Sequence, residues 1–166
     1  MNDTYVECLV KRQPKPILNV CKFALIFLTA VIGFFSVLVF GSMIGFIAAI
    51  ALGVGAYFVN VNSDIEYEYL YVDREITIDK VMAKTRRKRI AKYDVEKIEV
   101  LAPINSYHLD EFKNRQTKNL DFSTGEPNAE HRFVFYYEGQ QRIIIDPSAE
   151  FVKAVYNIAP RKVFTD

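Results

Sequence analysis

The sequence is poor in the residues that build the commonest cofactor and metal sites. It has two cysteines, Cys8 and Cys21, and neither lies in a C-x-x-C pair or at a zinc-ligand spacing from a histidine. Beyond residue 63 there is no cysteine, which excludes a disulfide framework there, and the only glycines are Gly125 and Gly139. Phosphate-binding loops and dinucleotide-binding glycine motifs are therefore absent. We expect no metal and no cofactor.

Charge is missing from one long stretch. No Asp, Glu, Lys, Arg or His occurs in the 41 residues from 23 to 63. A bilayer core is about 30 Å thick, and a helix needs about 20 apolar residues to cross it. The stretch is long enough for two crossings. We predict a transmembrane hairpin over residues 19–61, with helices at 19–40 and 43–61 and a turn at Gly41-Ser42.

Small residues recur every four positions along the second predicted helix. Such a stripe lets helix backbones approach closely in lipid. We expect it to pack the two helices of the hairpin against each other, and the alternative is contact with a second copy or a partner subunit. The stripe consists of Gly41, Gly45, Ala49 and Gly53.

Basic residues flank the hairpin at both ends, and the turn between the helices has none. Because flanking basic residues stay in the cytosol, we predict a multi-pass protein of the cell membrane with both termini cytosolic. Residues 1–18 form a cytosolic N-terminal segment. We expect this segment to be either a short helix on the membrane surface or disordered, because Pro14 and Pro16 interrupt it.

Residues 62–166 are predicted to form a cytosolic, β-rich domain. Its charge is close to neutral, which argues against a nucleic-acid binder. Residues 65–72 alternate with period two, which is typical of a strand. A polar excursion at 102–130 is expected to hold a helical turn at 106–113. Strands are predicted at 65–72, 75–81, 86–93, 95–101, 120–123, 131–138 and 141–146.

One amphipathic helix is predicted after the last strand. Asp146 is a suitable N-cap residue, and Pro147 suits the first helical position. An apolar face at helical spacing follows, and Pro160 ends the helix. The face consists of Phe151, Val152, Val155 and Ile158.

The order of about seven strands and one C-terminal helix resembles a pleckstrin-homology-like (PH-like) barrel or roll. The matching segments are 67–72, 75–78 and 94–100, and they resemble the bacterial PH-like domains that follow a pair of transmembrane helices. The segments 3–12 and 121–125 are similar to an uncharacterised family of small bacterial two-helix membrane proteins, a domain of unknown function. This resemblance implies a bacterial inner-membrane location and a barrel or roll closed by the helix. It assigns no functional residue.

Six cations fall within nine residues soon after the hairpin. Basic clusters beside a membrane bind anionic headgroups, at about 1 kcal/mol per residue. The alternative is a solvated strand whose charges pair with acidic neighbours on the preceding strands, where six carboxylates are available. We predict lipid contacts for Lys84, Arg86, Arg87, Lys88, Arg89 and Lys92.

The sequence contains no G-x-S-x-G, H-E-x-x-H or paired-carboxylate motif. We therefore expect a non-catalytic, membrane-anchored adaptor with no small-molecule substrate. Its primary ligand is a protein partner or a second copy, bound through the 102–130 excursion, and anionic lipid is secondary. One alternative is a structural subunit of a larger membrane complex. Another is a small membrane-bound hydrolase assembled from His108, Asp110, Glu111, Ser123 and His131.

Overall fold

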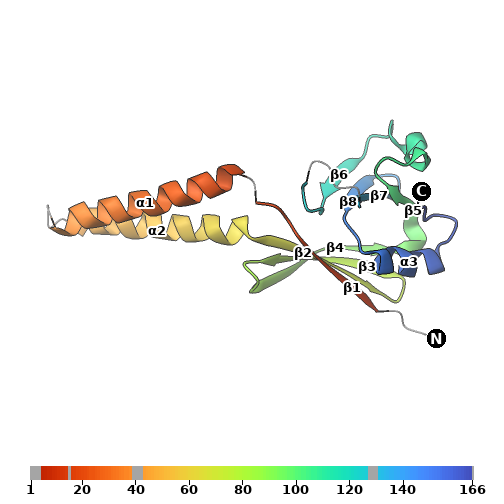
Figure 1. Cartoon of the computed structure of the whole chain (residues 1–166), viewed down its shortest axis with the longest axis horizontal. Coiled ribbons are helices and arrows are strands. Elements are labelled where there is room, and N and C mark those ends of the chain that lie inside the picture. Colours follow the sequence, from red (N-terminus) through yellow and green to blue (C-terminus); the bar gives the residue numbers. More distant parts are fainter. Residues whose placement is uncertain (1–4, 15, 39–42, 127–130, 166) are drawn as a thin grey trace. The chain divides into compact units, whose positions relative to one another are not determined.

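The computed structural model describes residues 5–14, 16–38, 43–126 and 131–165. The chain divides into two compact units, and Figure 1 shows their helices and strands. One unit contains residues 14–65 together with 82–85. The other contains residues up to Gln13, 66–81 and everything from Arg86 onwards.

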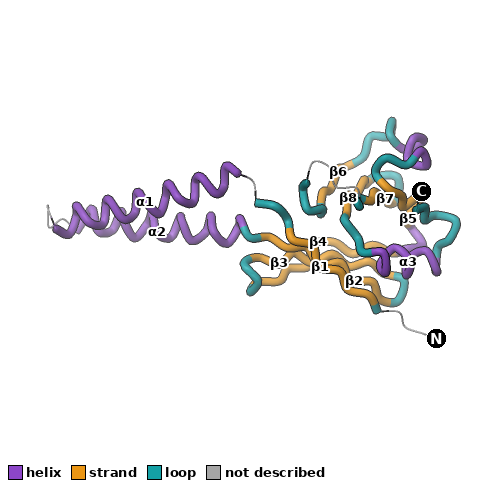
Figure 2. The backbone as a smooth tube through the Cα atoms, viewed as in Figure 1, coloured by secondary structure: helices purple, strands orange, loops and turns teal. Residues whose placement is uncertain are grey.

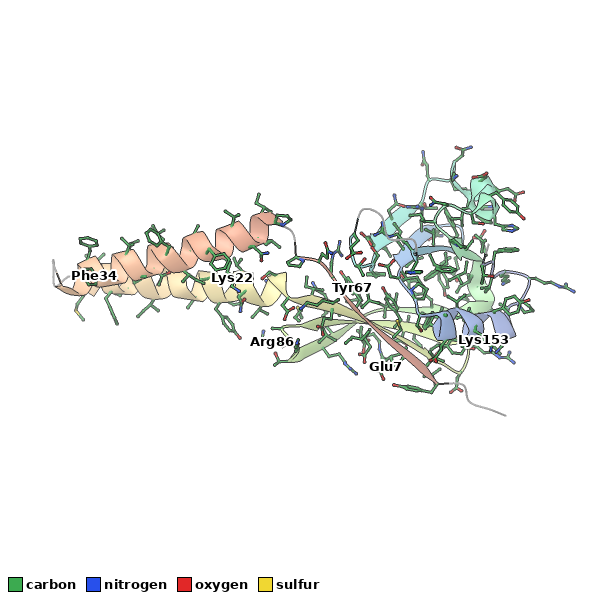
Figure 3. All side chains as sticks on the ribbon, in the orientation of Figure 1. Glu7, Lys22, Phe34, Tyr67, Arg86 and Lys153 are labelled. Atoms are coloured by element: carbon green, nitrogen blue, oxygen red, sulfur yellow. The ribbon has the colours of Figure 1, made fainter. Side chains whose placement is uncertain are left out.

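The helical unit consists of two long helices that lie side by side (Figures 1 and 2). Helix α1 spans Pro16–Leu38 and helix α2 spans Met43–Ser63. Each contains a segment of 21 residues that is long enough and apolar enough to cross a membrane. Most of their large apolar side chains are exposed, including Phe34, which Figure 3 labels on α1. The predicted Gly41-Ser42 turn lies outside the described residues.

Four strands form the first sheet, in the order β1-β2-β3-β4. Strand β1 is antiparallel to β2. Val6, Cys8 and Val10 of β1 lie opposite Tyr71, Tyr69 and Tyr67 of β2, and these tyrosines are buried. The strands are β1 (Val6–Lys11), β2 (Ile65–Val72), β3 (Glu75–Met82) and β4 (Arg86–Asp94).

Strand β1 corrects the prediction for the N-terminal segment. A surface helix or disorder was expected there, and both are wrong for Val6–Lys11. The segment belongs to the same compact unit as the later strands. In the chain, α1 and α2 lie between two strands that pair in space. The helical hairpin is thus an insertion into a β-hairpin.

Tight turns connect the other strands of this sheet. Asp73 and Arg74 have φ values of 50° and 66°, and Ala83 and Lys84 have φ values of 48° and 57°. Two consecutive residues with positive φ form the turn whose twist matches that of the paired strands. The predicted turn at Asp73-Arg74 is present, although neither hairpin carries the glycine that usually occupies such a turn.

A second four-stranded sheet has the order β5-β7-β8-β6, with β6 parallel to β8. The strand predicted from Val95 begins only at Ile98. Val95–Lys97 is a 3-10 turn (η1) because the Asp94 side chain accepts a hydrogen bond from Glu96 N. The helical turn expected in the polar excursion is present as η2 (Tyr107–Phe112). The strands are β5 (Ile98–Pro103), β6 (Lys118–Asp121), β7 (Phe133–Tyr137) and β8 (Gln141–Ile145).

Helix α3 spans Ala149–Ile158, and its N-cap differs from the prediction. Ser148 is the N-cap residue, and its Oγ accepts a hydrogen bond from Phe151 N at 3.2 Å. Asp146, the predicted cap, instead accepts hydrogen bonds from Thr124 N and Thr124 Oγ1, both at 2.7 Å. A hydroxyl two residues further along the chain displaces the carboxylate because the carboxylate is already bound by a neighbouring loop.

Aromatic side chains connect the two sheets and the helix. Phe151 of α3 is fully buried, and its ring contacts those of Tyr69 and Tyr71 edge-on. Tyr93 of β4 lies 5.1 Å from Phe135 and 5.0 Å from Tyr137, measured between ring centroids. These aromatic side chains therefore form part of the core, where edge-on ring pairs are common.

Candidate functional site on the cationic strand

Strand β4 and the turn before it hold the basic run, and half of its cations are paired. Arg87 Nη2 lies 2.6 Å from a carboxylate oxygen of Glu68 on β2. The other two pairs join β4 to β3. They are Arg89 with Asp79 at 3.6 Å and Lys92 with Glu75 at 2.7 Å. For these three cations the structure matches the alternative of cross-strand pairing.

Two of the three acidic partners are buried. The side chain of Glu68 is 2% exposed and that of Asp79 is 6% exposed. Burial raises the pKa of Glu68, a hydrogen bond with Glu7 raises it further, and Arg87 opposes both effects. A buried carboxylate needs a compensating charge, and Arg87 and Arg89 supply it within the sheet.

The neighbouring carboxylate of Glu7 on β1 behaves differently. Tyr5 donates a hydrogen bond of 2.7 Å to Glu7 Oε2. That bond and the hydrogen bond from Glu68 lower the pKa of Glu7, which is exposed. Glu68 is therefore the carboxyl of the pair that holds a proton more readily.

The other three cations, Lys84, Arg86 and Lys88, are exposed. Within the described part of the chain they have no ion pair. Lys84 lies in the β3–β4 turn, where Ala83 N donates a 2.9 Å hydrogen bond to Asp64 O. Asp64 directly follows the last residue of α2. Figure 3 shows Arg86 at the end of the sheet formed by this turn. We call Lys84, Arg86 and Lys88 the cationic tip.

The small-residue stripe of α2 faces α1 at the positions that the structure describes. A Cβ built on Gly45 would lie 2.7 Å from Ser36 Cβ, which is too close for any side chain. Further along, Ala49 Cβ lies opposite Gly33, and Gly53 lies opposite Thr29. Gly41 is outside the described residues. These contacts lie within one hairpin.

Three of the five residues considered for a hydrolase contact other side chains. His108 stacks on the ring of Phe164, with 3.6 Å between ring centroids. Asp110 pairs with Lys113, three residues away and exposed. Ser123 Oγ donates to Asp121 Oδ1 at 2.6 Å. Glu111 lies with His108 in η2, whereas His131 lies two residues before the start of β7 and lines a groove. Among the described residues no three His, Cys, Asp or Glu side chains converge on a metal position.

That groove was not anticipated from the sequence. It has a volume of about 880 Å³. It is lined by residues 8–11 of β1, by Thr124, Glu126 and His131, and by residues 146–149 around the start of α3. No sequence signal marked it, because part of its lining is the strand that the sequence did not reveal. We call it the β1 groove.

The chain has two four-stranded sheets with a C-terminal helix, and an apolar pair of helices is inserted after the first strand. These features define the class of protein: a PH-like domain joined to two candidate membrane helices. Residues 2–165 match the profile of the family described as Bacterial PH-like domain (DUF6106), and the chain belongs to that family. The resemblance inferred from the sequence is thus confirmed. Searches of curated proteins and of solved structures returned no match.

Proposed function

We propose that this chain is a membrane-anchored, non-catalytic binding module. Its helices cross the bacterial inner membrane twice, and its domain, a PH-like roll closed by α3, lies in the cytosol and recruits a protein partner. Anionic headgroups are a secondary ligand that holds the domain at the bilayer. The observation that carries the proposal is the hydrogen bond from Ala83 to Asp64, one residue beyond the end of α2.

That hydrogen bond ties the β3–β4 turn to the end of a helix that is long enough to span a membrane. With α2 in the bilayer, its end at Ser63 lies close to the headgroups, and so does the turn that carries Lys84. Cations near an anionic surface each contribute about 1 kcal/mol. Three of them at the cationic tip favour an anionic surface over a neutral one by a factor on the order of a hundred.

The experiment uses the full chain in nanodiscs. The sequence has no tryptophan, so Thr85→Trp supplies a single reporter in the exposed part of the turn. We expect brominated lipid to quench this reporter strongly in discs that contain phosphatidylglycerol and weakly in discs of phosphatidylcholine alone. Salt at 0.5 M should remove the difference, because exposed charges are screened.

Two triple variants separate free cations from paired ones. Lys84→Gln, Arg86→Gln and Lys88→Gln together should abolish the lipid-dependent quenching without lowering the melting temperature. The second variant combines Arg87→Gln, Arg89→Gln and Lys92→Gln, and it removes the same amount of charge. It should have a lower melting temperature. At temperatures where it is still folded, the lipid-dependent quenching should persist. Equal loss of quenching in both variants would show that the effect is general charge and would overturn the assignment of the tip.

A further inference from the structure

A polar pocket of about 340 Å³ lies beside the second sheet, and we call it the β6–β8 pocket. Among the described residues none that lines it is acidic, and all seven that do have side chains able to donate a hydrogen bond. Three are the cations Lys113, Arg115 and Arg142, and two are Gln116 and Thr117 in the loop before β6. A pocket that offers donors and positive charge without a carboxylate is complementary to an anion.

Strand register brings the other two lining residues beside one of these cations. Asn119 of β6 lies opposite Arg142 of β8, and Arg142 lies opposite Tyr136 of β7. Directly opposite residues on neighbouring strands point to the same face of a sheet, so the three form a row across the second sheet. One position along, Phe135 and Ile143 point to the opposite face and are fully buried. The sheet therefore fixes where these three donors lie.

Tyr136 contributes a hydroxyl from an otherwise buried side chain. The residue is 2% exposed, and its ring packs against that of Phe112 with 5.0 Å between the centroids. Within the described part of the chain its hydroxyl makes no hydrogen bond. An unpaired polar group at a largely buried position is unfavourable, so an acceptor bound in the pocket stabilises it.

Arg142 is the cation of the pocket that lacks a counter-charge. Its side chain is partly buried, and it has no ion pair within the described residues. Partly buried charges are screened less by salt than exposed ones. The fork of a guanidinium also matches a phosphate or a carboxylate with two parallel hydrogen bonds. Arg142 is therefore the centre of the expected anion site.

The other two cations have acidic partners outside the lining of the pocket. Lys113 Nζ lies 2.5 Å from Asp110, and both side chains are more than half exposed, so this pair contributes little. Arg115 Nη1 donates a hydrogen bond of 2.6 Å to Glu99, which leaves most of its N–H groups for another acceptor. Neither carboxylate lines the pocket. Both cations can therefore contribute to binding a second anion.

We propose that the β6–β8 pocket binds a phosphate monoester group, carried either by a soluble metabolite or by a lipid headgroup. Such a group has about two negative charges at pH 7 and three strong acceptor oxygens, which suits three cations better than a single carboxylate does. The volume of about 340 Å³ is that of a small-ligand site. The proposal goes beyond the binding module proposed above, because it adds a small anionic ligand at a site separate from the cationic tip.

The test uses the full chain in discs of phosphatidylcholine, with empty discs as the blank. The probe is phenyl phosphate, read by saturation-transfer difference nuclear magnetic resonance. We expect a signal above that of empty discs, and inorganic phosphate should displace it more effectively than sodium chloride at equal ionic strength. Benzoate has the same ring with a single charge, and it should bind roughly tenfold more weakly or worse.

Matched variants place the binding site. Arg142→Gln should weaken the binding of phenyl phosphate roughly tenfold or more. Lys118→Gln removes the same charge from an exposed position one residue before Asn119, outside the lining, and should leave binding unchanged. Tyr136→Phe removes only the hydroxyl and should weaken binding roughly threefold or more. None of these variants should lower the melting temperature.

Three results would each overturn the proposal. They are a signal no larger than that of empty discs, benzoate that binds as well as phenyl phosphate, and equal weakening by Arg142→Gln and Lys118→Gln. Two further discs identify the source of the phosphate. If phosphatidic acid, a monoester, displaces phenyl phosphate and phosphatidylglycerol, a diester, does not, the ligand is a lipid headgroup. If neither lipid displaces it, the ligand is soluble.

Failure of this proposal can be told apart from failure of the proposed function. Binding of phenyl phosphate should persist when Lys84, Arg86 and Lys88 are all changed to Gln, because these residues lie outside the pocket. Conversely, Arg142→Gln should retain lipid-dependent quenching of the reporter at position 85. Loss of both properties in either variant would contradict the assignment of two separate sites.

Discussion

At the scale of single residues, the basic run divides into structural and free cations. The sequence contains six cations in this run and six acidic neighbours, and it is compatible with both lipid binding and cross-strand pairing. Which cation meets which carboxylate depends on the register of β4 against β3 and of β3 against β2, and the sequence does not encode that register locally. The structure pairs Arg87, Arg89 and Lys92, and it leaves the cationic tip exposed.

Arg87 is the cation whose removal should cost the most stability. Arg87→Gln leaves the buried Glu68 carboxylate without its counter-charge, and because Arg87 itself is 57% exposed we expect a loss of about 1–2 kcal/mol at pH 7. Arg86→Gln, one residue earlier on the same strand, should change stability by less than about 0.5 kcal/mol. Thermal unfolding of the full chain in detergent measures both. Equal losses would contradict the pairing.

The cost of Arg87→Gln should depend on pH. Because burial raises the pKa of Glu68 in the folded state, the folded protein binds this proton more tightly than the unfolded chain does. Stability therefore falls as pH rises from the ordinary glutamate range through the raised folded-state pKa. Without Arg87 the pKa rises further, so the difference in melting temperature between variant and parent should be largest near pH 7 and shrink towards pH 5. A difference that does not change with pH would show that Glu68 is not the group involved.

At the scale of elements, the local periodicity of the sequence predicted most of the helices and strands. All seven expected strands have counterparts, and so do the two long helices and the C-terminal helix. Strand β1 was missed because it is six residues long, its Leu9 is exposed, and its partner follows only after the whole helical hairpin. The cap of α3 was misplaced because Thr124, more than twenty residues upstream, already binds Asp146.

The packing of α1 on α2 can be tested with two glycines of the same helix. Gly45→Leu should force the helices apart, because its side chain would meet Ser36, whereas Gly55 has open space around it. Pulsed electron paramagnetic resonance between spin labels at Phe23 and Phe58, two exposed positions, measures the separation. Both native cysteines are first replaced by serine.

We expect Gly45→Leu to lengthen and broaden the distribution of distances between the labels, and Gly55→Leu to leave it unchanged. Small residues permit close approach of helices in lipid, so the effect should be the same in detergent and in discs. An unchanged distribution in Gly45→Leu, accompanied by loss of a dimer, would instead assign the stripe to contact between copies.

At the scale of the whole molecule, the insertion of the helices between paired strands constrains the topology. β1 and β2 are hydrogen-bonded neighbours, so the residues before α1 and after α2 must lie on the same side of any membrane. The chain can then cross an even number of times, and two helices allow two crossings. Flanking basic residues predicted both ends on one side, and the β1–β2 pairing supports that prediction by a separate argument.

The most direct test of this account is the accessibility of single cysteines in intact inverted and right-side-out membrane vesicles. Cysteines are introduced one at a time at Tyr5, Ile44 and Tyr156, all exposed, in a chain without Cys8 and Cys21. We predict that an impermeant maleimide labels positions 5 and 156 from the cytosolic face and position 44 from the opposite face. Labelling of all three positions from one face would mean that the hairpin does not span the membrane, and would contradict the central claim.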